Sequence, residues 1–154
     1  MDVLTQDLGI LLRVAAAMLF GGVVGFEREL GRHTAGLRTH MMIAGAAALI
    51  VSLGDIVAQD FAREPYRELL RVDPLRLIEA VVAAVGFVGA GAILRAGGRD
   101  RVRGLTTASS LLMAAAIGIA AGLGNYLLAF GASLLGVTVL AVLRRLERKL
   151  DTRD

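Results

Sequence analysis

The chain has 154 residues, of which 56% are hydrophobic, with a mean hydropathy of +0.67 and a formal net charge of +3. A soluble domain of this length needs a polar shell. Here the charged residues are bunched between long apolar blocks, which predicts one polytopic membrane domain. The chain has no cysteine, which excludes disulfides and thiolate metal sites. The basic excess lies beside the apolar blocks, as topogenic charge does, and argues against a nucleic-acid surface.

The first apolar block, residues 8–26, has no basic residue before Arg13 and no small-residue cleavage site soon after it. It is therefore expected to stay in the membrane and not to be a cleaved signal peptide. Each apolar block is near the length of about 20 residues that a helix needs to cross the hydrocarbon core. Open strands would leave backbone groups unpaired in lipid, so helices are expected. The predicted all-α fold has five transmembrane helices, at about residues 8–26, 40–58, 77–95, 105–122 and 126–143.

Two connections between the spans are informative. The segment 122–125 is short and predicts an antiparallel hairpin of the last two spans. The segment 60–76 is long, contains Pro65 and Pro74, and has apolar residues that could form a short helix on the membrane surface.

The distribution of basic residues predicts the orientation. The loops after the first and third spans and the C-terminal tail share one side and together carry 12 basic residues, whereas the other side carries four, offset by acidic neighbours. By the positive-inside rule, the N-terminus is expected outside and the C-terminus in the cytoplasm.

Glycines indicate where helices approach closely, because small residues allow the backbone contact that holds helices together in lipid. The first and fourth spans each contain a small-xxx-small step. The third span has three glycines within six residues, which predicts a local break, a close crossing or a backbone-lined pocket. These residues are Gly21 and Gly25, Gly118 and Gly122, and Gly86, Gly89 and Gly91.

With this topology, polar groups from four spans lie near the cytoplasmic boundary. In a structural interpretation, the carboxylates pair with arginines and a threonine caps the fourth span. In a functional interpretation they form a site: two carboxylates and a threonine hydroxyl suit Mg²⁺, although neighbouring arginines oppose a cation. His40 either responds to pH or only hydrogen-bonds. The candidate residues are Glu27, Arg28, Glu29, Arg38, Thr39, His40, Gly89, Gly91, Thr106 and Thr107.

A second ionisable group lies toward the outer third of the predicted spans. Arg13, Asp55 and Glu79 come from the first three spans. Ionisable residues inside a membrane are rare and pair with one another or mark a pathway. An ion pair of Arg13 with Asp55 or Glu79 is expected, and an outward-facing cation vestibule is the alternative.

The order of these motifs resembles the membrane domain of the MgtC/SapB family of bacterial inner-membrane proteins, over roughly residues 8–143 and as a single domain spanning residues 1–154. Three signatures carry the resemblance. They are Gly25, Glu27, Arg28, Glu29, Ala35, Gly36, Leu37, Arg38, Thr39 and His40; Gly86, Phe87, Gly89, Ala90, Gly91 and Ile93; and Gly104, Leu105, Thr106, Thr107, Ala108, Ile117 and Gly118. The chain departs from the family at Leu112, where a Trp is usual, and at Ala80, where a Gln is usual.

The resemblance implies a multi-pass protein of the bacterial inner membrane with a role in adaptation to low magnesium and in survival inside host cells. Many relatives have a soluble domain after the fifth span, and none is expected in this chain. The sequence contains no GxxxxGK[ST] loop and no DKTGT-like segment, so an enzyme is not expected.

Two functions from different classes are compatible with these features. One is a membrane regulator that acts through contacts with another inner-membrane protein and holds no resident cofactor. The other is a homo-oligomeric transporter or channel subunit for a cation such as Mg²⁺, because five short helices enclose little volume alone. The second function needs a hydrated route between the two polar levels, and Ser52 is one of few polar side chains there. A sensor of a lipid or metabolite is a third possibility.

Overall fold

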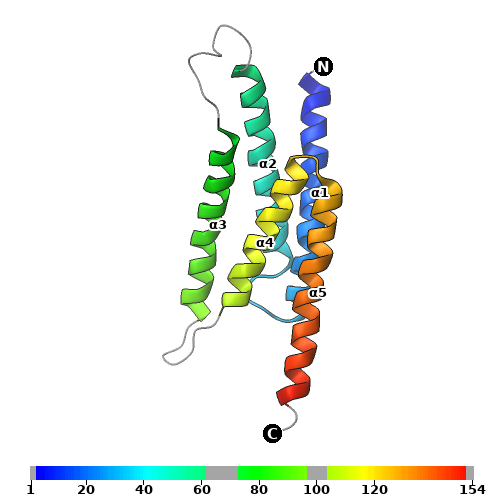
Figure 1. Ribbon diagram of the computed structural model, residues 1–154, viewed down its shortest axis with the longest axis vertical. Helices are drawn as coiled ribbons and strands as arrows, with labels where there is room; N and C mark the ends of the chain where they lie inside the picture. Colours follow the sequence, from blue (N-terminus) through cyan, green and yellow to red (C-terminus); the bar gives the residue numbers. More distant parts are fainter. Residues whose placement is uncertain (1–2, 62–72, 97–103, 152–154) are drawn as a thin grey trace.

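The computed structural model describes residues 3–61, 73–96 and 104–151. In this part of the chain, five helices run alternately in opposite directions (Figure 1), and all five are long and apolar enough to cross a membrane. The predicted all-helical membrane class is therefore confirmed. The helices are α1 (Val3–Leu30), α2 (Leu37–Phe61), α3 (Pro74–Ala96), α4 (Leu105–Gly122) and α5 (Tyr126–Asp151).

The predicted spans lie inside these helices. Helix α4 begins and ends as predicted, whereas the other four extend beyond the apolar blocks because backbone hydrogen bonding continues past the last apolar residue. The two ends of the chain lie at opposite ends of the bundle (Figure 1). Which end faces the cytoplasm stays a prediction. The predicted surface helix falls mainly on residues 62–72, outside the described residues.

Helix α2 packs against both α1 and α4, and glycines make both contacts close. A Cβ added to Gly25 of α1 would lie 2.9 Å from the Cα of Leu37, and one added to Gly122 of α4 would lie 2.9 Å from the Cα of Ala48. Real side chains do not approach a backbone so closely, so only glycine fits there. The two predicted small-xxx-small contacts are confirmed, and both are made against the backbone of α2.

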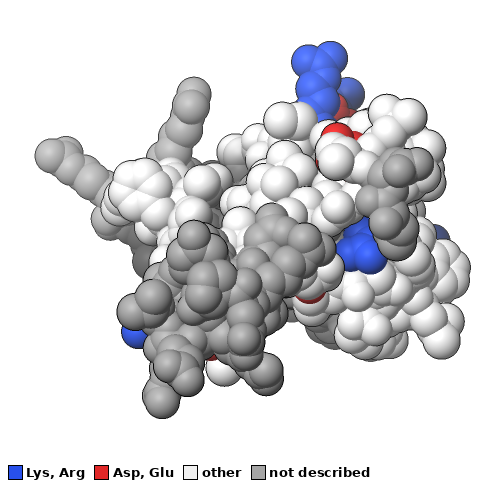
Figure 2. Space-filling model, turned by 90° about the horizontal axis from the view of Figure 1, so that it is seen from above, with Lys and Arg blue, Asp and Glu red and all other residues white. Residues whose placement is uncertain are grey.

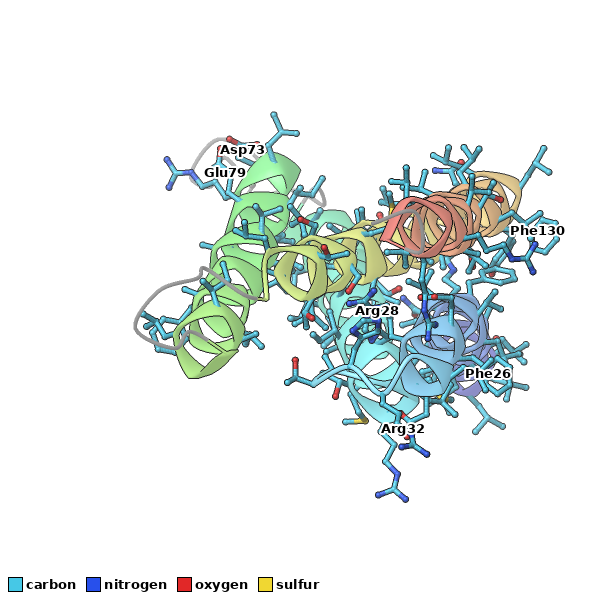
Figure 3. All side chains as sticks on the ribbon, turned by 90° about the horizontal axis from the view of Figure 1, so that it is seen from below. Phe26, Arg28, Arg32, Asp73, Glu79 and Phe130 are labelled. Atoms are coloured by element: carbon cyan, nitrogen blue, oxygen red, sulfur yellow. The ribbon has the colours of Figure 1, made fainter. Side chains whose placement is uncertain are left out.

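Helix α3 lies at the edge of the bundle, where it packs against α4 and α2 (Figures 1 and 3). It buries mainly Val81, Val85 and Gly89, which are four residues apart and so lie on one face. A Cβ at Gly89 would lie 3.2 Å from that of Ala108 in α4, whereas one at Gly86 or Gly91 would meet nothing within 4 Å. The close crossing predicted for the third span is thus confined to Gly89, and the helix continues without a break from Pro74 to Ala96.

The described outer surface is mainly apolar, as a lipid-facing surface must be. Seen from the end at which α1 begins, few charged side chains are visible among the described atoms (Figure 2). Large side chains such as Phe87, which is 83% exposed, project outward. Buried polar groups other than Ser133, which bonds to the carbonyl oxygen of Phe20, lie toward the ends of the bundle. The rest of the buried interior consists mainly of small apolar residues. These buried residues include Ala17, Val24, Ala44, Ala48, Ile117 and Ala121.

Candidate functional site

A group of polar side chains is buried at the end of the bundle where α1 and α5 end and α2 and α4 begin. We call this end the C-terminal end and the group the polar cluster. Four helices contribute to it, which brings together residues that are far apart in the sequence. The cluster consists of Glu27 and Arg28 from α1, His40 from α2, Thr107 and Ser110 from α4, and Arg144 from α5.

Arg28 lies at the centre of the polar cluster. It follows Gly21 and Val24 on the buried stripe of α1, because residues three and four apart share a helix face. Only 4% of Arg28 is exposed. Figure 3 shows it inside the bundle, whereas Arg32 points away from it. Its Nη2 donates a hydrogen bond of 3.4 Å to Oγ1 of Thr107, and its Nε is buried with no hydrogen-bond partner among the described residues.

Glu27 is the carboxylate of the polar cluster, and its side chain is 11% exposed. Its Oε1 accepts a hydrogen bond of 3.4 Å from Nη1 of Arg144, and its Oε2 lies 3.9 Å from Nη1 of Arg28. Two guanidinium groups therefore share one carboxylate. The cluster keeps a net positive charge.

His40 is fully buried and links α2 to α4. Its Nδ1 lies 2.8 Å from the carbonyl oxygen of Gly36 and its Nε2 lies 3.0 Å from Oγ of Ser110. A carbonyl oxygen only accepts, so Nδ1 carries a proton. In the neutral ring Nε2 is then an acceptor, and the single hydroxyl proton of Ser110 is shared between Nε2 and the carbonyl oxygen of Thr107, 2.8 Å away.

A cavity of about 290 Å³ opens beside the polar cluster, between α4, α5 and the loop that joins α1 to α2. Burial against this cavity lowers the pKa of His33 below its ordinary value of 6.5, and the charges of Arg28 and Arg144 lower it further, against an opposing effect of Glu27. The uncharged form of His33 is therefore favoured. The lining residues are Arg28, His33, Gly104, Thr106, Thr107, Val139, Leu140, Leu143 and Arg144.

The structure does not bring all the candidate residues into this cluster. Each residue of a helix is rotated by about 100° from the one before it. Glu29 is two residues after Glu27 and therefore points to nearly the opposite side of α1. Its Oε2 instead accepts a hydrogen bond of 3.0 Å from the backbone N–H of Leu37, at the start of α2. Arg38 and Gly91 are exposed, and Thr39 is half-buried. Glu29 therefore holds the α1–α2 hairpin together.

The oxygen atoms of the polar cluster are not arranged as ligands for Mg²⁺. A hard cation needs several oxygen ligands. Glu27 lies between two arginines and Glu29 is bonded to Leu37, so the two carboxylates do not converge. Among the described residues, no group of three or more histidine and acidic side chains could hold a metal ion.

The outer ionisable group is arranged differently from the expectation. Arg13 forms no ion pair with Asp55 or Glu79 among the described residues, and both carboxylates are exposed. Nη1 of Arg13 donates a hydrogen bond of 3.0 Å to the carbonyl oxygen of Gly122, which also accepts one of 3.1 Å from Ser52. The end of α4 leaves carbonyl groups without intrahelical partners and attracts a cation, which explains the choice of partner.

Sequence reasoning overlooked His33, Ser110 and Arg144. Arg144 is the first basic residue after the fifth predicted span, so it counts among the topogenic charges of the C-terminal tail. A signal was nevertheless present, because Ser133, Gly136, Leu140 and Arg144 follow one another at spacings of three and four and so share the face of α5 that packs on the bundle. No comparable signal in the sequence marks His33, which lies in a loop.

Comparison with known proteins shows the family of the chain. Residues 14–149 match the MgtC family. The chain is 41% identical to protein SapB of Bacillus subtilis over 86% of its length and 55% of that protein. It is 36% identical to protein MgtC of Brucella abortus over 90% of its length and 52% of that protein. It is 33% identical to protein MgtC of Salmonella typhimurium over 92% and 55%, respectively. The chain thus spans about half the length of these relatives, and no solved structure matches it.

Proposed function

Because the chain belongs to the MgtC family, we propose that this multi-pass membrane protein is a regulator of the bacterial inner membrane that acts through protein contacts during adaptation to low magnesium. The observation that carries this proposal is the mainly apolar interior between the two polar levels. Arg13 and Ser52 are bonded to Gly122 at one level, and Arg28 and Glu27 form the polar cluster at the other.

The described core between those levels is mainly alanine, valine and isoleucine, and the hydroxyl of the buried Ser133 there is already bonded to the carbonyl oxygen of Phe20. An ion crossing within a single chain would lose its hydration there without gaining polar ligands, which is strongly unfavourable. The positive charge of the polar cluster also disfavours cations. A regulator needs no such path, and the exposed Arg32 and Arg38 offer charged contacts for a partner at the C-terminal end.

The alternative is a homo-oligomeric cation transporter or channel. One observation favours it: α3 leaves Gly86 and Gly91 without neighbours, so a second copy could approach this helix closely. Asp55 and Glu79 are exposed, and a route for a cation would then run between copies of the chain.

A flux assay separates the two functions. The purified chain is reconstituted in liposomes that contain a Mg²⁺-sensitive dye, with protein-free liposomes as the control. The proposal predicts the same Mg²⁺ entry in both preparations. Faster entry with the protein would overturn the regulator and support the transporter.

A growth assay tests whether the polar cluster takes part. In a bacterium that needs a relative of this chain for growth in low magnesium, Glu27→Gln is expected to restore growth poorly, because it removes the charge that two arginines share. Glu29→Gln is the matched control, since an amide oxygen can still accept the hydrogen bond from Leu37. Equal growth of both variants, at equal membrane levels, would contradict a role for the cluster.

A further inference from the structure

We propose that the cavity at the C-terminal end binds a phosphate group, and that an apolar groove beside it accommodates the acyl chain when the phosphate belongs to a lipid. The inference does not depend on whether the protein regulates a partner or moves an ion. It follows from the charges, the hydrogen-bond donors and the position of the cavity.

Two guanidinium groups, of Arg28 and Arg144, line the cavity from two helices. Only 4% of Arg28 is exposed, and its Nε has no hydrogen-bond partner among the described residues. A buried donor without a partner is costly, and an anion in the cavity would provide one. Arginine is well suited to phosphate because its planar group donates two parallel hydrogen bonds.

The start of α4 forms another wall. Gly104 precedes the helix with φ of 93°, and no side chain caps the helix. The N–H groups of the first turn have no acceptors within the helix, and the helix dipole makes this end positive. Thr106 and Thr107 add hydroxyl groups to the same wall. Backbone donors, hydroxyls and guanidinium groups together match the oxygens of a phosphate.

The charge balance also favours an anion. Glu27 is the one carboxylate paired with these arginines among the described residues: Oε1 accepts a hydrogen bond from Arg144, and Oε2 lies 3.9 Å from Nη1 of Arg28 without a hydrogen bond. Glu29 is turned away and bonded to Leu37. His33 lines the same cavity and adds a further positive charge when it is protonated, although its lowered pKa favours the uncharged form.

The position matches that of lipid phosphates. Arg28 and Arg144 lie in the last turns of the apolar segments of α1 and α5, where hydrocarbon gives way to headgroups. Basic pockets between transmembrane helices bind anionic headgroups. A groove of about 350 Å³ continues from the cavity between α4 and α5, sharing Thr106, Val139 and Leu140 with it. Its other lining is mostly apolar and includes Leu105, Met113 and Leu135, which suits an acyl chain.

Binding is measured with the full chain in detergent, using three probes: inorganic phosphate, dioleoyl phosphatidylglycerol, and dioleoylglycerol, which has the same acyl chains without the phosphate. Native mass spectrometry counts bound lipid, and thermal unfolding followed by circular dichroism reports phosphate, since a ligand of the folded state raises the unfolding temperature. Phosphatidylglycerol is expected to bind at least about tenfold more tightly than dioleoylglycerol.

Arg144→Gln is the main variant and Arg145→Gln its control, because Arg144 lines the cavity and the neighbouring Arg145 does not. Thr106→Val removes a cavity hydroxyl that makes no hydrogen bond to another side chain of the described residues, so its fold is expected to be intact. Both cavity variants should weaken phosphate and phosphatidylglycerol, by about tenfold for Arg144→Gln, while Arg145→Gln should not. Gly136→Leu extends a side chain into the groove and should weaken the lipid alone.

The outcomes identify the source of the phosphate. If both probes bind and depend on Arg144 and Thr106, or if phosphatidylglycerol alone does so, a lipid headgroup is the ligand. If inorganic phosphate alone does so, the site serves a soluble phosphate compound. The proposal is overturned if neither probe binds, if phosphatidylglycerol binds no better than dioleoylglycerol while phosphate does not bind, or if Arg144→Gln and Thr106→Val bind like Arg145→Gln.

Discussion

Glu27 and Arg144 are 117 positions apart in the sequence, and Oε1 of one lies 3.4 Å from Nη1 of the other. This contact joins the end of the apolar part of α1 to that of α5. Arg28 competes for the same carboxylate from 3.9 Å, so the pair belongs to a network in which positive charge exceeds negative charge.

Arg144→Gln should lower the free energy of unfolding by about 1 kcal/mol, because it removes a partly exposed partner of a mostly buried carboxylate. Arg145→Gln changes the neighbouring exposed arginine and should stay within about 0.5 kcal/mol of the parent protein. Unfolding in a detergent of graded denaturing strength measures both. Equal losses would mean that the contact with Glu27 contributes nothing.

Gly118→Ala should destabilise the protein by about 2 kcal/mol or more, because the added Cβ would overlap the carbonyl oxygen of Ala44 and lie 2.8 Å from its Cα. Gly91→Ala adds the same methyl group where nothing lies within 4 Å, and should be neutral or slightly stabilising since alanine favours the helix. Comparing the unfolding temperatures of the two variants tests the close contact between α2 and α4. A neutral Gly118→Ala would show that these helices are further apart.

Ser110→Ala should cost about 1–3 kcal/mol, because it leaves the buried Nε2 of His40 without its partner. Ser109→Ala is the control. Its hydroxyl is exposed and bonds only within α4, to the carbonyl oxygen of Leu105, so the loss should be within about 0.5 kcal/mol. Unfolding measurements on both serine variants decide whether His40 and Ser110 hold α2 against α4, and similar losses would argue that they do not.

Stability should decrease as the pH falls through the ordinary histidine range. The pKa of His33 is lowered in the folded protein by burial and by Arg28 and Arg144, so the unfolded chain binds a proton first and acid favours unfolding. The contribution of His33 is present above pH 6.5 and is lost below it. Unfolding temperatures of the parent and His33→Asn are compared between pH 7.5 and pH 5. The decrease should be smaller in the variant, and parallel curves would contradict the assignment to His33.

The five spans and the two glycine contacts could be predicted from the sequence, because hydropathy and small-residue spacing are local properties. The polar cluster could be predicted in part. Glu27, Arg28, His40 and Thr107 meet as the topology implied, but the sequence does not fix the rotation of each helix about its axis, and Glu29 and Arg38 proved to face elsewhere. The partner of Arg13 could not be predicted, because it is a backbone carbonyl oxygen at Gly122, and such an acceptor has no signature in the sequence.

The convergence of the α1–α2 loop with the start of α4 is tested most directly by cross-linking. The chain has no cysteine, so introduced thiols report without background. His33 and Thr106 line the same cavity, and a His33→Cys, Thr106→Cys double variant in native membranes should be bridged by one short bis-maleimide. Asp55→Cys with Thr106→Cys should not be, because Asp55 lies toward the other end of α2, about 27 Å along the helix from Leu37. Intact mass spectrometry distinguishes one bridging linker from two separate ones. Two separate linkers in the His33 and Thr106 variant, or a bridge in the Asp55 control, would contradict the arrangement.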